Sequence, residues 1–160
     1  MNKNEQIWHA LVQECQKHVE ILDYAYGKLQ YLLPFTAETM RRLTMETIAA
    51  IDQFVFRFSK LQDAIGQKLF KATLDCLGEE ASGRPFIDIF NRLEKLGVVE
   101  DMTRWQELRI IRNETAHEYD QNKYELAEKL NKLINSKDSL VDYLNTIVKY
   151  MASRGIGSEV

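Results

Sequence analysis

Apolar residues recur along this chain at spacings of three, four and seven, which is the pattern of amphipathic helices. The first such stretch predicts a helix from Glu5 to Leu33. Its apolar face contains Ile7, Leu11, Val19, Leu22 and Leu29. Pro34 ends this helix, because the residue before a proline is pushed out of the helical region.

A second and longer apolar stripe follows. Thr36 is a favoured N-cap residue type, and the stripe continues from there to Leu77. A companion row that includes Gln62 widens the stripe, as in a bundle helix covered by several neighbours. We expect one helix of about 40 residues, near 60 Å long at about 1.5 Å per residue, with a bend near Gly66.

Turn residues divide the next part of the chain. Residues 78–84 are rich in glycine and charged residues and predict a loop. Pro85 suits the first turn of a helix over residues 85–96, and Gly97 suits its C-terminal cap. A fourth helix is expected to begin near Asp101 or Thr103.

The last helical region covers residues 123–151 and is predicted to break near residues 135–137. We assign residues 1–152 to a single domain and residues 153–160 to a flexible tail. With only 2 prolines and 7 glycines in 160 residues, long helices are favoured over short strands. The expected fold is all-α, an up-and-down helical bundle of about five helices.

Composition adds expectations about nucleic-acid binding and about location to this picture. The net charge of −3 means that any role in binding nucleic acid must rest on a local basic site. The chain shows neither the apolar core of a signal peptide nor a run of about 18 apolar residues. Cys15 and Cys76 lack metal-ligand spacing and predict reduced thiols. We therefore expect a soluble, cytoplasmic protein.

One segment concentrates chemically useful side chains within eleven positions: Arg109, Arg112, Asn113, His117 and Tyr119. A guanidinium matches phosphoryl oxygens with a planar fork of donors. An imidazole can accept and donate protons near neutral pH. This combination of side chains suits a site for a phosphate ester. RNA in particular can be cut with no external nucleophile, because its own 2′-hydroxyl attacks the neighbouring phosphorus.

Helix geometry limits how this segment can act. Asn113 and His117 are four residues apart and share a helix face. Arg112 and His117 are five apart, so about 140° separates them on a continuous helix. They would converge through the length of the arginine, a loosened helix near His117, or a second subunit. A two-fold interface would also supply both proton roles, so we expect a dimer.

The spacing of Arg112, His117 and Tyr119, with Asn113 after the arginine, resembles the R-x4-H-x-Y motif of HepT-type HEPN toxins. Two flanking stretches are similar to the family as well: residues 51–63 and 105–109. The likeness covers about residues 45–150.

The resemblance implies a toxin of a toxin–antitoxin system, an endoribonuclease that needs no metal or other cofactor. It implies a homodimer with Arg112 and His117 as catalytic residues from both chains. It also implies an antitoxin partner, a minimal nucleotidyltransferase of the MntA type, that transfers AMP to Tyr119. Adenylate on Tyr119 would add bulk and negative charge two residues from His117 and so repel RNA.

Each motif residue has a plainer interpretation. Arg112 could be a solvated helix residue paired with Glu107 or Glu114. His117 could interact with the dipole at a helix C-terminus, and Tyr119 could be an aromatic at the edge of the core.

Two supporting residues are also open to either interpretation. Asp63 could orient a motif side chain across the bundle, or it could be an ordinary surface carboxylate. Arg109 could help to bind phosphate, or it could form a structural ion pair with Glu107 or Asp63.

At the level of function, the alternative to a ribonuclease is a non-catalytic helical subunit of a two-component nucleotidyltransferase, which binds a substrate or partner. A third reading is a purely structural bundle in which the motif is a coincidence.

Overall fold

A computed structural model describes residues 1–116 and 122–157 of the chain. Within these residues the regular structure is entirely helical, with no β-strand. The prediction of an all-α bundle is therefore confirmed.

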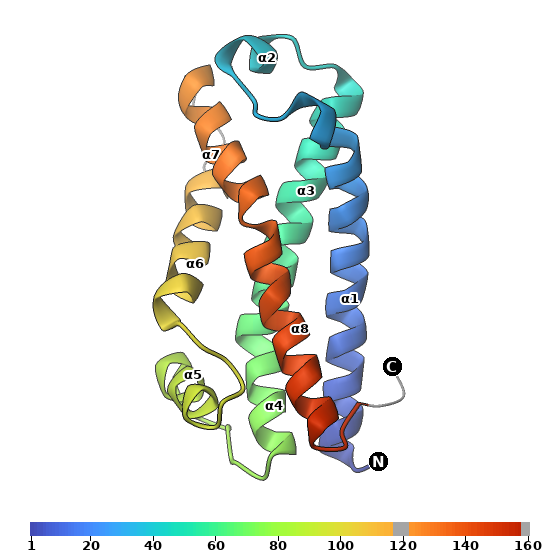
Figure 1. Ribbon diagram of the computed structural model, residues 1–160, viewed down its shortest axis with the longest axis vertical. Helices are drawn as coiled ribbons and strands as arrows, with labels where there is room; N and C mark the ends of the chain where they lie inside the picture. The colour runs from blue at the N-terminus through green and yellow to red at the C-terminus, as the bar shows by residue number, and fades with distance from the viewer. Residues whose placement is uncertain (117–121, 158–160) are drawn as a thin grey trace.

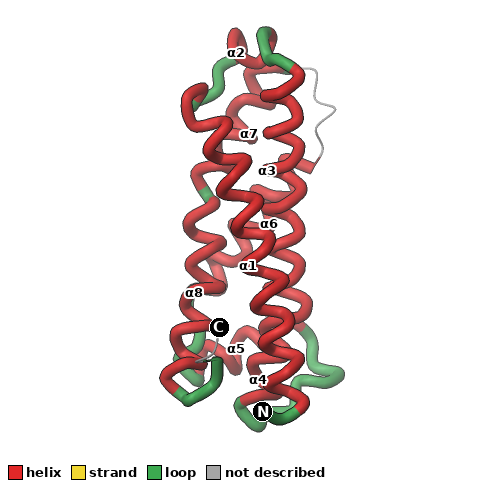
Figure 2. The backbone as a smooth tube through the Cα atoms, turned by 90° about the vertical axis from the view of Figure 1, so that its right-hand side faces the viewer, coloured by secondary structure: helices red, strands yellow, loops and turns green. Residues whose placement is uncertain are grey.

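Four helical rods that alternate in direction form the bundle (Figure 1). In chain order the rods are α1 (Lys3–Leu29), α3–η2–α4 (Met45–Asp63, Ala64–Leu69 and Phe70–Cys76), α6 (Met102–Ala116) and α7–α8 (Lys123–Asn135 and Lys137–Ser153). Three shorter elements complete it: η1 (Gln30–Leu32), α2 (Ala37–Arg41) and α5 (Phe86–Lys95). The start of α1 and the end of α8 lie at the same end of the rods (Figure 2).

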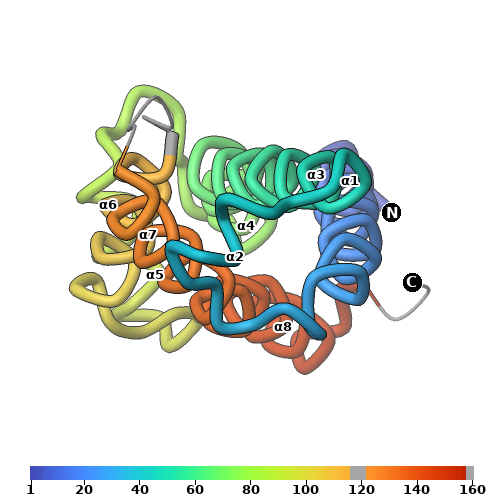
Figure 3. Tube along the Cα trace, turned by 90° about the horizontal axis from the view of Figure 1, so that it is seen from above, coloured from blue at the N-terminus to red at the C-terminus, as the bar shows by residue number. Residues whose placement is uncertain are grey.

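The two ends of the bundle are closed differently. Viewed along the long axis, α2 crosses one end between the α3 and α7–α8 rods (Figure 3). Towards the other end, α5 lies below α6 and beside α4 (Figure 1). The core between the rods is rich in fully buried aromatic rings: Trp8, Phe54, Phe58, Phe70, Phe90 and Trp105. None of the described helices has the length and apolar content needed to cross a bilayer.

The prediction of one continuous helix after Thr36 is wrong. α2 ends at Arg41, and Arg42 leaves helical geometry at φ −116° and ψ 18°. Thr44 then starts α3, because its side chain accepts a hydrogen bond from the Thr47 backbone N–H. A second N-cap thus divides the stripe into a short helix at the end of the bundle and a long one along it.

At Gly66, where the sequence predicted a bend, the structure has a change of helix type. Ala64–Leu69 forms a π-helical segment that joins α3 to α4 without interrupting the rod. Such segments are rare, occur mostly as short insertions within α-helices and are frequent at functional sites.

The other boundaries agree with the sequence pattern to within a few residues. α1 gives way to a 3-10 turn at Gln30, and α6 begins at Met102. Gly97 has a φ of +80°, as its place after α5 requires. Ser136 separates α7 from α8, at the predicted break.

Candidate functional site

Helix α6 carries Arg109 and Arg112, and its buried face packs against the core. The Asp101 side chain accepts a hydrogen bond from the Arg104 backbone N–H at 3.0 Å and so caps its start. Trp105 and Leu108 are buried and anchor the helix against the core. Arg112, one turn beyond Leu108, lies half-buried beside this face.

Arg112 is held by a carboxylate from the neighbouring rod. Its Nη1 and Nη2 atoms each lie 3.1 Å from an oxygen of Asp63, the last residue of α3. The exposed fractions of the two side chains are 28% and 34%. A guanidinium has five N–H donors, so this pairing leaves three of them for another acceptor.

A cavity of about 530 Å³ opens beside this pair, between the α3–η2–α4 rod, α5 and α6. We call it the basic cavity. Its lining residues are Gln62, Asp63, Gly66, Gln67, Lys68, Lys71, Phe86, Ile89, Trp105, Arg109 and Arg112. Four of these are cations and one is an anion, a local excess of positive charge in a chain whose net charge is −3.

Two residues that line the basic cavity carry buried polar atoms without partners. Both amide atoms of Gln62 and the indole Nε1 of Trp105 have no hydrogen bond within the described structure. The two residues are only 3% and 1% exposed. The other tryptophan differs, because Trp8 donates to the Thr73 hydroxyl at 3.1 Å. A buried polar group without a partner costs about 1–3 kcal/mol, so these positions are not explained by stability.

Gly66 allows the π-helical segment to approach α6 closely. A Cβ atom at this position would lie 2.8 Å from Cζ2 of Trp105. The indole therefore packs directly on the backbone of η2. It also contacts the rings of Phe70 and Tyr143, with centroids at 5.0 and 5.1 Å.

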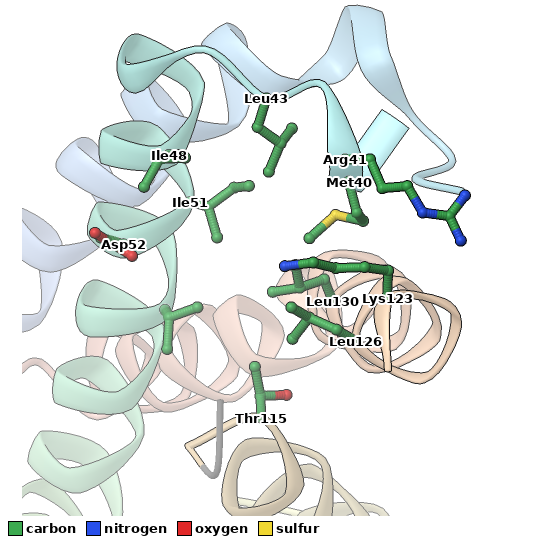
Figure 4. Close-up of a pocket in the computed structure, with 11 residues that line it drawn as sticks. Met40, Arg41, Leu43, Ile48, Ile51, Asp52, Thr115, Lys123, Leu126 and Leu130 are labelled. Carbon is green, nitrogen blue, oxygen red and sulfur yellow. The ribbon is translucent and has the colours of Figure 1, made fainter. Parts of the chain in front are cut away.

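A second cavity, of about 470 Å³, lies towards the α2 end of the bundle. Apolar side chains from α2, α3 and α7 line most of it, and Thr115 of α6 borders it (Figure 4). Lys123 extends from the start of α7 into the space between α7 and α3 (Figure 4). Two cations, Arg41 and Lys123, and one carboxylate, Asp52, line this mainly apolar cavity, against four cations in the basic cavity.

The structure places the remaining predicted residues as follows. Arg109 is exposed, and its guanidinium carbon lies 6.0 Å from the ring centroid of Phe86. Asn113 is exposed on α6. His117 and Tyr119 lie outside the described residues.

The carboxylate of Asp63 contacts a motif side chain across the bundle, as one of its two interpretations expected. Arg112 pairs with Asp63 instead of Glu107 or Glu114. No ion pair of Arg109 with Glu107 or Asp63 occurs in the part of the chain that the structure describes. In the same part, no three histidine, cysteine or acidic side chains are grouped as metal ligands would be.

Sequence reasoning missed several residues of the basic cavity. Gln62 was visible as a polar residue within an otherwise apolar row, and this signal could have identified it. Lys68 and Lys71 are three apart on the same rod and resemble any solvated pair. Phe86 comes from a separate helix, and nothing local indicates that it faces Arg109.

Comparison with protein-family models, with curated proteins and with solved structures finds no match to this chain.

Proposed function

We propose that this protein is an endoribonuclease toxin of the HepT-type HEPN class, in which Arg112 and His117 carry out RNA cleavage without a metal. The observation that carries the proposal is the position of Arg112. Its guanidinium is fixed by Asp63 at the edge of the basic cavity and keeps three donors for a phosphate.

The chemistry needs only groups that the motif contains. The RNA 2′-oxygen attacks phosphorus and the bond to the 5′-oxygen breaks, so the products are a 2′,3′-cyclic phosphate and a 5′-hydroxyl. One proton leaves the 2′-hydroxyl and one reaches the leaving oxygen. His117 serves one of these transfers, and Arg112 stabilises the negative charge that develops on the phosphoryl oxygens.

A homodimer completes the proposal. A single imidazole covers one of the two proton transfers, whereas a two-fold interface brings two copies of His117 to one phosphate. Each chain would then contribute Arg112 and His117 to a shared cleft. The dimer remains a proposal based on this requirement and on the family resemblance.

Regulation by a nucleotidyltransferase antitoxin of the MntA type is the second part of the proposal. Transfer of AMP to Tyr119 would place a phosphodiester two residues from His117. Its negative charge would repel the RNA backbone and its bulk would block the cleft.

The test is RNA cleavage by the purified protein, freed from any partner and shown by intact mass to be unmodified. We expect wild-type cleavage to be lost in His117→Ala and in Arg112→Ala, with the helical circular dichroism unchanged. If the unmodified wild-type protein cuts no RNA, the proposal fails.

The Asp63 carboxylate also supports a second candidate, a non-catalytic subunit of a two-component nucleotidyltransferase. Its charge beside Arg112 opposes that of an incoming phosphate, and the chain as a whole carries −3. Nucleotidyltransfer that requires both proteins, together with no cleavage by the unmodified chain alone, would favour this candidate.

A further inference from the structure

The outer face of α3 carries an exposed apolar row. Met45, Ile48 and Phe56 are 79%, 37% and 49% exposed, and Ala49 of the same row is exposed as well. Spacings of three, four and seven place these four residues on one face of the helix. Exposed apolar side chains that are scattered singly need no explanation, whereas a patch of them marks a site of interaction. This row is therefore a candidate docking surface.

A groove between α1 and α3 borders this row at Ala49. Its volume is about 370 Å³, and we call it the α1–α3 groove. Its apolar lining includes Ile21, Tyr24 and Ala25 of α1 together with Ala49. Phe56 lies two helical turns further along α3, at a distance of about 10 Å. An exposed aromatic ring and an apolar hollow thus share one face of the molecule.

A two-fold axis perpendicular to α3, between Asp52 and Gln53, joins this ring to this groove. It makes α3 of one copy antiparallel to α3 of the other, with each residue opposite the one equally distant from the axis. Phe56 of each copy then lies opposite the partner's Ala49 and enters the α1–α3 groove there. Because a two-fold interface repeats every contact, both rings and both grooves are used at once.

The charges beside the ring and beside the hollow are opposite. Lys60 Nζ lies 5.5 Å from the centroid of the Phe56 ring and forms no ion pair within the described residues. Glu46 lines the α1–α3 groove and contacts Lys28 at 3.1 Å, yet 77% of its side chain is exposed. In the antiparallel arrangement Lys60 lies opposite the partner's Glu46. Each ring therefore enters the groove together with a cation that meets a carboxylate there.

The acid nearest the axis has cations beside it. Asp52 would face the partner's Asp52, and Arg41 and Lys123 line the same cavity as this carboxylate. None of the three forms an ion pair in the part of the chain that the structure describes. Lys123 extends into the space between α7 and α3 (Figure 4), so its charge offsets that of the two carboxylates.

The axis also suits the position of α6. In the view along the long axis, α1 and α6 lie on opposite sides of α3 (Figure 3). Thr115, near the end of α6, lines the same cavity as Asp52 and Val55, so this end of α6 lies at the level of the axis. The two-fold axis therefore places the ends of both α6 helices on one side of the dimer and close to each other.

We infer that the outer face of α3 binds a second copy of this chain, with Phe56 of each copy in the α1–α3 groove of the other. The inference deepens the proposed function and rests on it, because the shared cleft requires a second copy as the occupant. The α1 side of each α3 becomes buried in the interface, and the α6 side borders the cleft.

Sedimentation velocity of the purified, unmodified protein measures its self-association. We expect the wild type to be a dimer at micromolar concentration. Phe56→Asp should weaken this association by at least about 100-fold, because symmetry removes the buried ring twice and brings a carboxylate to each apolar groove. The helical circular dichroism should not change, since Phe56 is about half exposed within one chain. Ile87→Asp is the matched control, because Ile87 of α5 is 53% exposed and lies outside the row, so this dimer should stay intact.

A cysteine at the axis tests the register. Asp52→Cys should form an intermolecular disulfide on mild oxidation, because a residue next to the axis brings its Cα atom within the range of about 4.4–6.8 Å that a disulfide needs. Asn145→Cys, at an exposed position of α8, should not cross-link. Lys60→Glu should weaken the dimer by placing an acid opposite Glu46, and Glu46→Lys added to it should restore the association.

Three results would each overturn the inference: a wild-type protein that stays monomeric at submillimolar concentration, an intact dimer in Phe56→Asp, or no cross-link in Asp52→Cys. These results are distinct from failure of the nuclease. RNA cleavage with a dimer insensitive to Phe56→Asp would reject this interface alone. A dimer that depends on Phe56 and cuts no RNA would reject the nuclease alone.

Discussion

The guanidinium of Arg112 and the carboxylate of Asp63 face each other through two N···O contacts of 3.1 Å, although 49 residues separate them in the chain. This pair joins the end of α3 to α6 and fixes one side of the arginine. Because two of its five donors are engaged, the arginine presents the other three in a defined direction. The proposed catalysis therefore makes Asp63 a positioning residue.

Replacement of Asp63 by alanine tests this role. In Asp63→Ala we expect kcat for RNA cleavage to fall about tenfold or more, because Arg112 is no longer held in place. KM should not rise, since a charge that repels RNA is removed. The free energy of unfolding should fall by at most about 1 kcal/mol, because the pair is partly solvated. Steady-state kinetics and thermal unfolding measure the two effects.

Asp63→Asn provides the matched control. The amide keeps one acceptor oxygen for Arg112, so more of the wild-type kcat should remain than in Asp63→Ala. A lower Tm in both variants with an unchanged kcat would mean that the ion pair is only structural.

The contact between Gly66 and Trp105 leads to a prediction about stability. In Gly66→Ala the new Cβ would lie 2.8 Å from Cζ2 of Trp105, so the indole or the π-helical segment must move. We expect a net loss of about 1–3 kcal/mol in the free energy of unfolding. Gly27→Ala is the control. Gly27 lies in α1, and a Cβ atom added there would meet no neighbouring atom within 4 Å. It should stabilise the protein by about 0.5–1 kcal/mol, and equal effects at both sites would contradict the packing argument.

His18 should make stability depend on pH. Its Nδ1 lies 3.0 Å from Arg57 Nη1, and burial first, then the charge of Arg57, lower its pKa below 6.5. Lys60 and Lys68 act in the same direction, and Glu14 opposes them. Below pH 6.5 the unfolded chain therefore binds a proton that the folded protein does not. Stability from this group is complete above pH 6.5 and decreases as the pH falls towards the folded-state pKa.

We expect the Tm of the wild-type protein to fall more between pH 7.5 and pH 5.5 than the Tm of His18→Gln, whose amide can still accept from Arg57. Other titrating groups are common to both proteins and cancel in the difference. Parallel Tm profiles would show that His18 does not carry this dependence.

The two thiols should be unreactive in the folded protein. Burial is the main cause that raises the pKa of Cys15 to about 12 and that of Cys76 to about 11. Because the thiolate is the reactive form, a chromogenic disulfide at pH 8 should modify neither cysteine rapidly. In denaturant both should react at once. Fast modification of Cys15 in the native protein would show that α1 opens readily.

The sequence predicted best where backbone chemistry is local. Pro34 and Pro85 restrict φ, whereas Gly97 permits a positive φ, and helices end or begin beside these residues as expected. The division between α2 and α3 was missed, because Met40 and Leu43 continue the apolar period across it and only Thr44 indicates a second N-cap.

The site was predictable only in part, for a different reason. Arg112 was identified from its spacing to His117, which is local. Asp63 was named as a residue that could orient a motif side chain. Its pairing with Arg112 depends on how α3 packs against α6, whereas Glu107 and Glu114 lie much closer in sequence. The close approach of Trp105 to Gly66 likewise depends on how α6 packs against the neighbouring rod, which no pattern along one helix reveals.

The most direct test of the central claim uses RNA with a single 2′-deoxy substitution at the preferred cleavage position, in the presence of EDTA. We predict that unmodified wild-type protein cuts the all-ribose strand and leaves a 2′,3′-cyclic phosphate. The substituted position should stay intact, and Arg112→Ala and His117→Ala should each reduce the rate by about 10²–10⁴-fold. Cleavage at the 2′-deoxy position, or full activity in both variants, would contradict the account.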